Sequence, residues 1–180
     1  MKKVTIILSI FCLLIFGSNV FAEESEETLT AASEWIYDDM SCCVYVEGTL
    51  SGDVTIPANI NGNQPYALMT NTLAGQNEIT SLTLPEGMYA LQDNSVTQMD
   101  NVKSITLNED LEVIGRCNIS NCLALTSITI PASVRMIDSS FMQCENLQEI
   151  RFLGECPRFL ETGFCFYWLP DDYVIYVPDD

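Results

Sequence analysis

The 180-residue sequence contains no histidine, and this absence excludes much chemistry. Ser–His and Cys–His nucleophiles need an imidazole as base. Zinc centres are usually built from histidines or closely spaced cysteine pairs, and no C-x-x-C pair is present. The sequence also has no glycine-rich phosphate loop and no D-x-D-x-D-G calcium loop. We therefore predict no catalytic, cofactor-binding or metal site, and a protein that is not an enzyme.

Basic residues are scarce as well. Seven Lys and Arg stand against 25 Asp and Glu, which gives a formal net charge of −18. Such a chain is repelled by nucleic acid and by anionic lipid, so neither is an expected partner. The simpler interpretation of the negative charge is solubility. The alternative is attraction to basic partners or to divalent cations.

Long apolar runs are absent except at the start of the chain. Lys2 and Lys3 precede an apolar stretch over residues 4–16, and Val20-Phe21-Ala22 fits a cleavage site. We predict a signal peptide over residues 1–22, since the run is short for the alternative, a membrane anchor. Cleavage would leave 5 basic and 25 acidic residues, hence 5−25=−20, and no membrane span.

What the chain does contain is a repeat. Four segments follow one pattern, and their central apolar positions are Leu82, Ile105, Ile128 and Ile150, so the steps are 105−82=23, 128−105=23 and 150−128=22. Further apolar columns keep the same spacing: Met88, Leu111 and Val134; Leu91, Ile114 and Ile137; Val96, Ile119 and Phe141; Met99, Cys122 and Cys144. A period in the low twenties with a Leu-x-x-Leu-x-Leu core is typical of a leucine-rich repeat solenoid.

Each repeat begins with a short strand. Leu82 and Leu84 alternate with Ser81 and Thr83, so one face is apolar and the other polar. A proline without a backbone donor ends the strand at position 85, and again at position 131. One repeat buries too little apolar surface to offset the entropy of ordering its backbone, so it is stable only when stacked on neighbours.

The segment Ile128 to Leu147, I-T-I-P-A-S-V-R-M-I-D-S-S-F-M-Q-C-E-N-L, resembles the BspA-like leucine-rich repeats of bacterial surface and secreted proteins. Earlier repeats depart from that pattern, because Val96 and Ile119 replace its Phe and Met99 replaces one Cys. With its flanks the resemblance spans residues 43–178. It implies a repeat solenoid: a strand-dominated right-handed superhelix with short irregular or helical convex segments.

The flanking segments complete the predicted domain organisation: signal peptide 1–22, mobile acidic leader 23–33, N-terminal cap 34–52, leucine-rich repeats 53–154 and C-terminal cap 155–180. The alternating stretch Tyr173 to Val177 is expected to pair with the last repeat and cap it. The aromatic run from Phe164 to Trp168 is expected to fill the space beside that strand. Its alternative role is a carbohydrate-stacking platform.

The outward strand positions are the candidate partner-binding residues. They form two columns on one face of the predicted sheet, with Thr55 at the start of the second column: Ser81, Ser104, Ser127 and Glu149; Thr83, Thr106, Thr129 and Arg151. One interpretation is structural, since Thr suits strands and stacked hydroxyls can bond each other. The other is functional, because solenoids bind partners on this extended surface.

Seven cysteines follow the predicted signal peptide, so at least one thiol is free or intermolecular. Cys122 and Cys144 share an inward column, where we favour small buried fillers over a disulfide. Cys156 and Cys165 flank a short loop and are the candidate disulfide.

Two functions are therefore compared. The first is a secreted or cell-surface, non-enzymatic protein that mediates protein–protein interaction or adhesion; its partner is a protein or a host-surface ligand, with a basic one favoured by the charge. The second is a structural or assembly component of the bacterial envelope without a diffusible ligand. A charged or apolar patch on the strand face favours the first, and a bare Ser/Thr face with apolar ends favours the second.

Overall fold

The structure is a computed structural model, and it describes residues 34–160 and 165–178. These residues belong to one compact unit, residues 31–180. The predicted signal peptide and acidic leader lie outside the described residues. Within the described part of the chain, no helix has the length and hydropathy that a membrane crossing requires.

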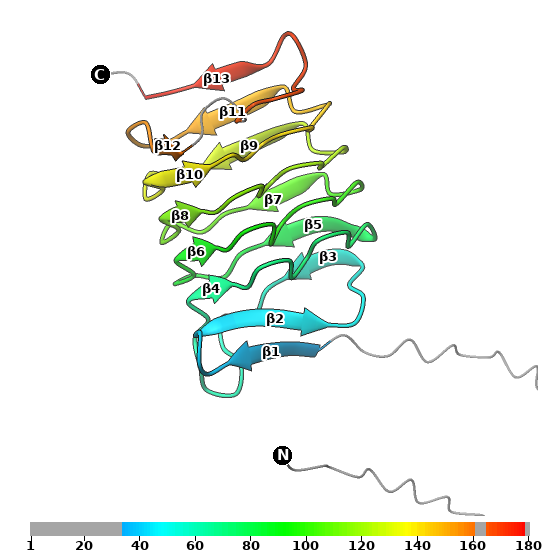
Figure 1. Cartoon of the computed structure of the whole chain (residues 1–180), viewed down its shortest axis with the longest axis vertical. Helices are drawn as coiled ribbons and strands as arrows, with labels where there is room; N and C mark the ends of the chain where they lie inside the picture. The colour runs from blue at the N-terminus through cyan, green and yellow to red at the C-terminus, as the bar shows by residue number, and fades with distance from the viewer. Residues whose placement is uncertain (1–33, 161–164, 179–180) are drawn as a thin grey trace, which may run out of the picture. The chain divides into compact units, whose positions relative to one another are not determined.

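The described residues form thirteen short strands (Figure 1). They are β1 Glu34–Asp38, β2 Cys43–Glu47, β3 Gly52–Thr55, β4 Ala67–Leu68, β5 Ile79–Thr83, β6 Ala90–Leu91, β7 Ser104–Thr106, β8 Val113–Ile114, β9 Ser127–Ile130, β10 Met136–Asp138, β11 Glu149–Phe152, β12 Arg158–Leu160 and β13 Val174–Tyr176.

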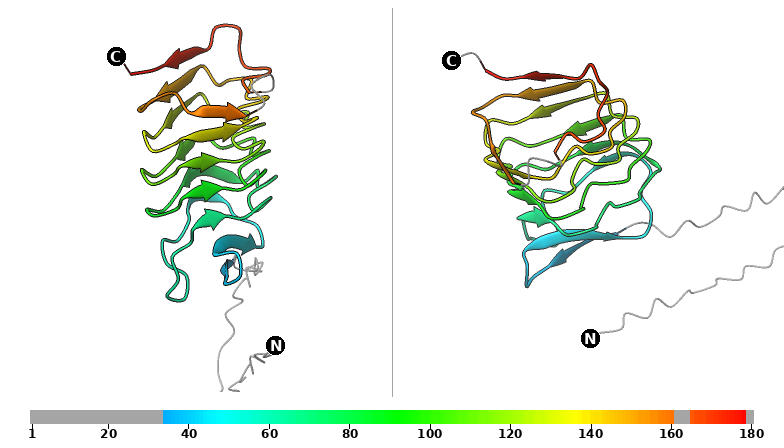
Figure 2. Two further views of the ribbon diagram at one scale, coloured as in Figure 1. Left: turned by 60° about the vertical axis from the view of Figure 1, so that its left-hand side comes forward. Right: turned by 45° about the horizontal axis from the view of Figure 1, so that its top comes forward.

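Successive coils of the chain contribute alternately to two sides of a stack (Figure 2). One side is a seven-stranded sheet in the order β1-β2-β4-β6-β8-β10-β12. The other side carries two three-stranded sheets, β3-β5-β7 and β9-β11-β13. All strand pairs are parallel except the β1–β2 hairpin, as expected when each coil returns one rung along the stack.

The repeat period sets the register of these ladders. Leu82 pairs with Ile105, and Ile128 pairs with Ile150. On the other side Leu91 pairs with Ile114, which pairs with Ile137. Residues one period apart therefore lie side by side, which is the arrangement that the sequence predicts.

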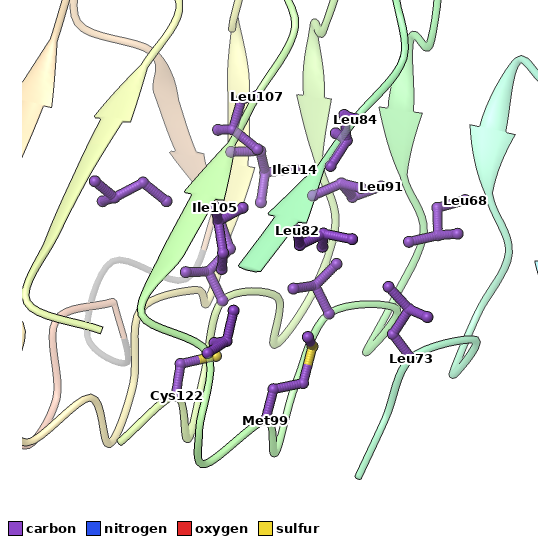
Figure 3. Packing of buried hydrophobic residues seen from close by; sticks show 14 of the residues in the cluster. Leu68, Leu73, Leu82, Leu84, Leu91, Met99, Ile105, Leu107, Ile114 and Cys122 are labelled. Carbon is purple, nitrogen blue, oxygen red and sulfur yellow. The ribbon is translucent and has the colours of Figure 1, made fainter. Parts of the chain in front are cut away.

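The core lies between the two sides and consists of the predicted apolar columns (Figure 3). All six strand residues predicted to be inward are buried: Leu82, Leu84, Ile105, Leu107, Ile128 and Ile130. The alternating Thr106 and Thr129 are exposed and Thr83 is half-buried. The predicted inward and outward faces are confirmed.

Irregular turns form the third side of each coil, and no helix occurs among the described residues. Left-handed backbone positions recur with the repeat at Asn71, Asn94 and Cys117, with φ of 61°, 55° and 55°. Asn tolerates the left-handed conformation better than most residues. This conformation turns the chain too sharply for a helix to begin. Of the two convex forms predicted, irregular and helical, the protein uses the irregular one.

A buried amide ties neighbouring coils together on this side. Asn118 is fully buried, and its Oδ1 accepts hydrogen bonds from Ser95 Oγ and the Val96 amide, both at 2.9 Å. Its Nδ2 donates to the carbonyl oxygens of Gln92 and Gly115. Because every polar atom of the amide has a partner, the buried group stabilises the turn rather than straining it.

The hairpin β1–β2 lies at the N-terminal end of the stack, where β2 pairs with β4. Trp35, Tyr37 and Val46 pack against the core from this hairpin. The hairpin therefore covers apolar surface that the first coil would otherwise expose.

At the C-terminal end, both sides of the stack gain one more strand. β12 pairs with β10, and β13 pairs with β11 with Ile150 opposite Ile175. The ring of Phe166 stacks on Phe141 of the preceding coil, with centroids 5.8 Å apart. The predicted pairing of Tyr173 to Val177 with the last repeat is present as β13. The aromatic run fills the space beside it only through Phe166, because Tyr167 and Trp168 are exposed; Phe164 lies outside the described residues.

Candidate functional site

The candidate site is the outward surface of β3, β5, β7, β9 and β11, which we call the strand face. Its two predicted columns are in register, since Ser81 pairs with Ser104 and Thr83 with Thr106. Ser127 likewise pairs with Glu149, and Thr129 with Arg151. Asp53 begins the first column opposite Ser81, with a carboxylate at the position where the next three members carry Ser.

Hydrogen bonds close the N-terminal end of the strand face. Asp53 Oδ1 accepts one from Ser81 Oγ at 2.7 Å and one from Thr80 Oγ1 at 3.0 Å. These two donors stabilise the ionised carboxylate and lower the pKa of Asp53, with Ser81 the larger cause. The hydroxyl of Ser81 is thereby already engaged.

The centre of the strand face is open. Within the described residues, no hydrogen bond engages the side-chain hydroxyls of Ser104, Thr106, Ser127 and Thr129. β7 and β9 belong to different sheets, so no ladder of backbone hydrogen bonds joins them. A hollow of about 410 Å³ lies there, with Lys103 and Glu109 among its lining residues. Hydroxyl and backbone groups at this gap are available to a ligand.

The C-terminal end of the strand face is charged and aromatic. Arg151 Nη2 lies 2.8 Å from Glu149 Oε1, and the Arg151 guanidinium lies 4.3 Å from the centroid of the Tyr176 ring. A second hollow, of about 380 Å³, is lined in part by Glu149, Asp172 and Tyr176. The face thus changes from hydroxyl groups to charge and aromatic surface along the stack.

Sequence reasoning missed a third column, which lies outside the strand face at the start of the other side of each coil. Its members recur with the period of the repeat, and each backbone N–H after the first donates to the carbonyl oxygen of the member before it: Tyr66, Tyr89, Glu112, Arg135 and Arg158. The rings of Tyr66 and Tyr89 stack with centroids 4.8 Å apart. The same period that revealed the core columns would have revealed this polar one.

One prediction concerns the hydroxyl of Tyr89 in this third column. It lies 3.1 Å from Glu112 Oε2, and that hydrogen bond, followed by burial and the Glu112 charge, raises the pKa of Tyr89. Glu112→Ala is expected to lower the Tyr89 pKa toward its ordinary value, because the neutral phenol loses its acceptor. Ultraviolet titration of tyrosine ionisation measures this shift, and Glu109→Ala is the control. Identical titrations of the Glu112→Ala variant and the wild-type protein would contradict the role of Glu112.

The seven described cysteines are all free thiols. Cys122 and Cys144 are buried in neighbouring coils without a disulfide, in agreement with the favoured filler role. The hydrogen bond with Cys144, together with burial, raises the pKa of Cys122. The expected bridge between Cys156 and Cys165 is not formed, since Cys156 is exposed whereas Cys165 packs into the core.

The described residues contain no group of three or more Cys, Asp and Glu side chains placed to hold a metal ion. The hollows of the strand face are open to solvent rather than enclosed. The arrangement suits contact with an extended partner surface.

Parallel ladders that follow the repeat period, with inward Leu and Ile columns, define a leucine-rich repeat solenoid. The chain belongs to the BspA-type leucine rich repeat region family, whose profile matches six copies over residues 67–167. A search of curated proteins gives no match.

The comparison with solved structures gives two leucine-rich repeat proteins. A leucine-rich repeat protein of T. pallidum is 16% identical with a TM-score of 0.50, and the match covers 77% of this chain and 88% of that one. A leucine-rich repeat protein of Bacteroides ovatus is 17% identical with a TM-score of 0.46. The latter match covers 78% of this chain and about half, 52%, of the other. Leucine-rich repeats generally serve as scaffolds for protein–protein interaction.

Proposed function

We propose that the protein is an exported, non-enzymatic binding protein whose strand face binds another protein or a ligand on a host surface. The observation that carries this proposal is the charged and aromatic end of that face, where Arg151 Nη2 lies 2.8 Å from Glu149 Oε1 and the guanidinium lies 4.3 Å from the centroid of the Tyr176 ring. Beside it, the exposed hydroxyls on β7 and β9 have no hydrogen-bond partner among the described residues, and no ladder joins these two strands. A charged patch next to unused donors and acceptors on an extended repeat surface favours a ligand over a purely structural ladder.

Export and adhesion rest on other support. The sequence of residues 1–22 has the pattern of a signal peptide. The BspA-like family, to which the repeats belong, contains bacterial surface and secreted proteins, and some of its members act in adhesion. The negative charge of the chain favours a partner that presents basic groups.

Blocking the centre of the strand face tests the proposal. The double variant Thr106→Tyr with Thr129→Tyr places two rings in the hollow between β7 and β9 and retains residues that suit strands. We expect a partner captured from a host-surface extract by the wild-type protein to bind the variant at least about tenfold more weakly. Titration calorimetry with the purified partner gives the two dissociation constants.

A matched control separates blocking from unfolding. Ala58→Tyr adds a ring at an exposed loop position outside the strand face and should bind the partner as the wild type does. Thermal melting of all three proteins confirms that each is folded. Equal affinity of the double variant and the control would show that the centre of the strand face does not hold the partner.

A second candidate function is an assembly component of the bacterial envelope. The exposed apolar side chains at the C-terminal end of the stack support it, because such surface can mediate repeated association. Sedimentation equilibrium decides between the candidates. An assembly component forms higher oligomers as its concentration rises, whereas a binding protein stays monomeric until its partner is added.

A further inference from the structure

The exposed apolar surface of the described residues is concentrated at the C-terminal end. Eight of the eleven exposed large hydrophobic side chains follow Phe152, and five of these are consecutive. They are Leu153, Tyr167, Trp168, Tyr173, Val174, Ile175, Tyr176 and Val177. Exposed apolar side chains gathered at one end of a protein favour an interaction site there.

The consecutive residues belong to an edge strand. β13 pairs with β11 along one edge, and no described strand pairs with its other edge. The Val174 N–H donates to the Gln148 carbonyl oxygen, so it points toward β11. Because backbone groups alternate along a strand, the N–H and C=O groups of Ile175 and Val177 point outward. This outer edge is a template for an added strand.

Acidic residues flank this edge strand in the sequence. Asp171 and Asp172 precede β13, and the sequence continues after Pro178 with two further Asp residues. Beside the strand, Asp172 and Glu149 line the hollow of about 380 Å³ together with Val174 and Tyr176. Arg151, the cation nearest in register, is already paired with Glu149.

The charge decides which occupant the edge fits. A second copy of this chain carries the same excess of acidic residues, so like-charge contacts between copies disfavour pairing. A strand with a basic residue beside Asp171 and Asp172 instead meets an opposite charge. The partner is thus defined by apolar residues in alternation and by Lys or Arg at each end, so that one cation reaches these carboxylates in either strand direction.

We propose that the outer edge of β13 binds an extended, basic-flanked segment of another protein as an additional strand. Backbone hydrogen bonds to Ile175 and Val177 provide the affinity, and a cation at Asp172 fixes the orientation. This site lies on the outer edge of β13, and it does not depend on the ligand proposed for the centre of the strand face.

Fluorescence anisotropy with four labelled peptides tests the contributions of backbone hydrogen bonds and of charge separately. The first peptide alternates Val and Thr between two pairs of lysines. The second replaces the lysines by glutamates, and the third and fourth keep the lysines but carry N-methyl groups on the amides of one edge or of the other. We expect binding of the first peptide that weakens with salt, with no binding of the second or of the version methylated on the paired edge.

Variants of the protein assign the site. Asp171→Asn with Asp172→Asn should weaken binding of the lysine peptide about three- to tenfold, whereas Glu78→Gln with Glu86→Gln, at exposed positions elsewhere, should not. Ile175→Pro removes one outward donor while the Val174 bond to Gln148 remains possible, and it should abolish binding. Circular dichroism checks that this variant is folded; if it is not, the methylated peptide alone decides.

Three results would overturn the proposal: equal binding of the glutamate peptide, equal binding of peptides methylated on either edge, or unchanged binding by the Asp171/Asp172 variant. A fourth is dimerisation of the peptide-free protein that Ile175→Pro abolishes, which would make a second copy the occupant of the edge.

Discussion

Ile128→Ala is expected to lower the free energy of unfolding by about 2–5 kcal/mol. Ile128 is 4% exposed and lies on β9 opposite Ile150 of the next coil. The coils above and below are held by their own backbone ladders, so they cannot collapse around the missing atoms. The lost apolar contact and the remaining cavity therefore both count against the folded state.

Chemical denaturation of the variant and the wild-type protein measures this difference. Thr129→Ala is the matched control, because Thr129 is the next residue on the same strand and points to solvent. Its effect should stay within about 0.5 kcal/mol. Equal shifts of the two midpoints would contradict the assignment of inward and outward positions. The slopes of the transitions must also agree, since repeat proteins can lose cooperativity.

Deletion of residues 171–180 is expected to convert a soluble protein into one that self-associates and melts at a lower temperature. The deletion removes β13 and bares the backbone edge of β11. It also removes the Tyr173 ring, which stacks on Phe166 with centroids 6.3 Å apart. The new edge presents unpaired backbone groups and the side chain of Ile150, which faced Ile175, and it has lost the Asp residues that flanked the old edge in the sequence, so copies can pair through it.

Sedimentation velocity and thermal melting test the deletion together. A shorter truncation that removes only residues 179–180 is the control, because it leaves β13 in place. The longer truncation should sediment as concentration-dependent oligomers, and the shorter one as the wild type does. A long truncation that stays monomeric with an unchanged melting temperature would refute the capping role of β13.

The sequence alone determined the repeat, its period and the two faces of each strand. This was possible because every coil repeats the same local pattern and contacts only its neighbours, so the spacing of the repeat translates directly into spatial adjacency. The buried Leu82, Ile105 and Ile128 and the exposed Thr106 and Thr129 followed from alternation alone. The family followed from the same columns.

Other features depended on contacts that no spacing encodes. The periodic hydroxyls of the strand face look equivalent in sequence, yet Ser81 is engaged by Asp53, while Thr106 and Thr129 have no partner in the described part of the chain and lie beside the gap between β7 and β9. The state of the Cys156 thiol likewise depended on where the chain carries Cys165, which packs into the core. Period fixes which residues become neighbours, but not the distances and orientations between them.

The two ends of the stack show most clearly which features follow from the sequence pattern and which depend on tertiary packing. Alternation in Tyr173 to Val177 predicted a strand against the last repeat, and β13 pairs with β11. The sequence did not show that this strand leaves an apolar edge exposed, because exposure depends on whether any other segment reaches it. The N-terminal hairpin covers its coil with Trp35 and Tyr37, whereas β13 has no described neighbour on its outer edge. Burial at a chain end is set by tertiary packing, since the repeat pattern stops where its next neighbour is missing.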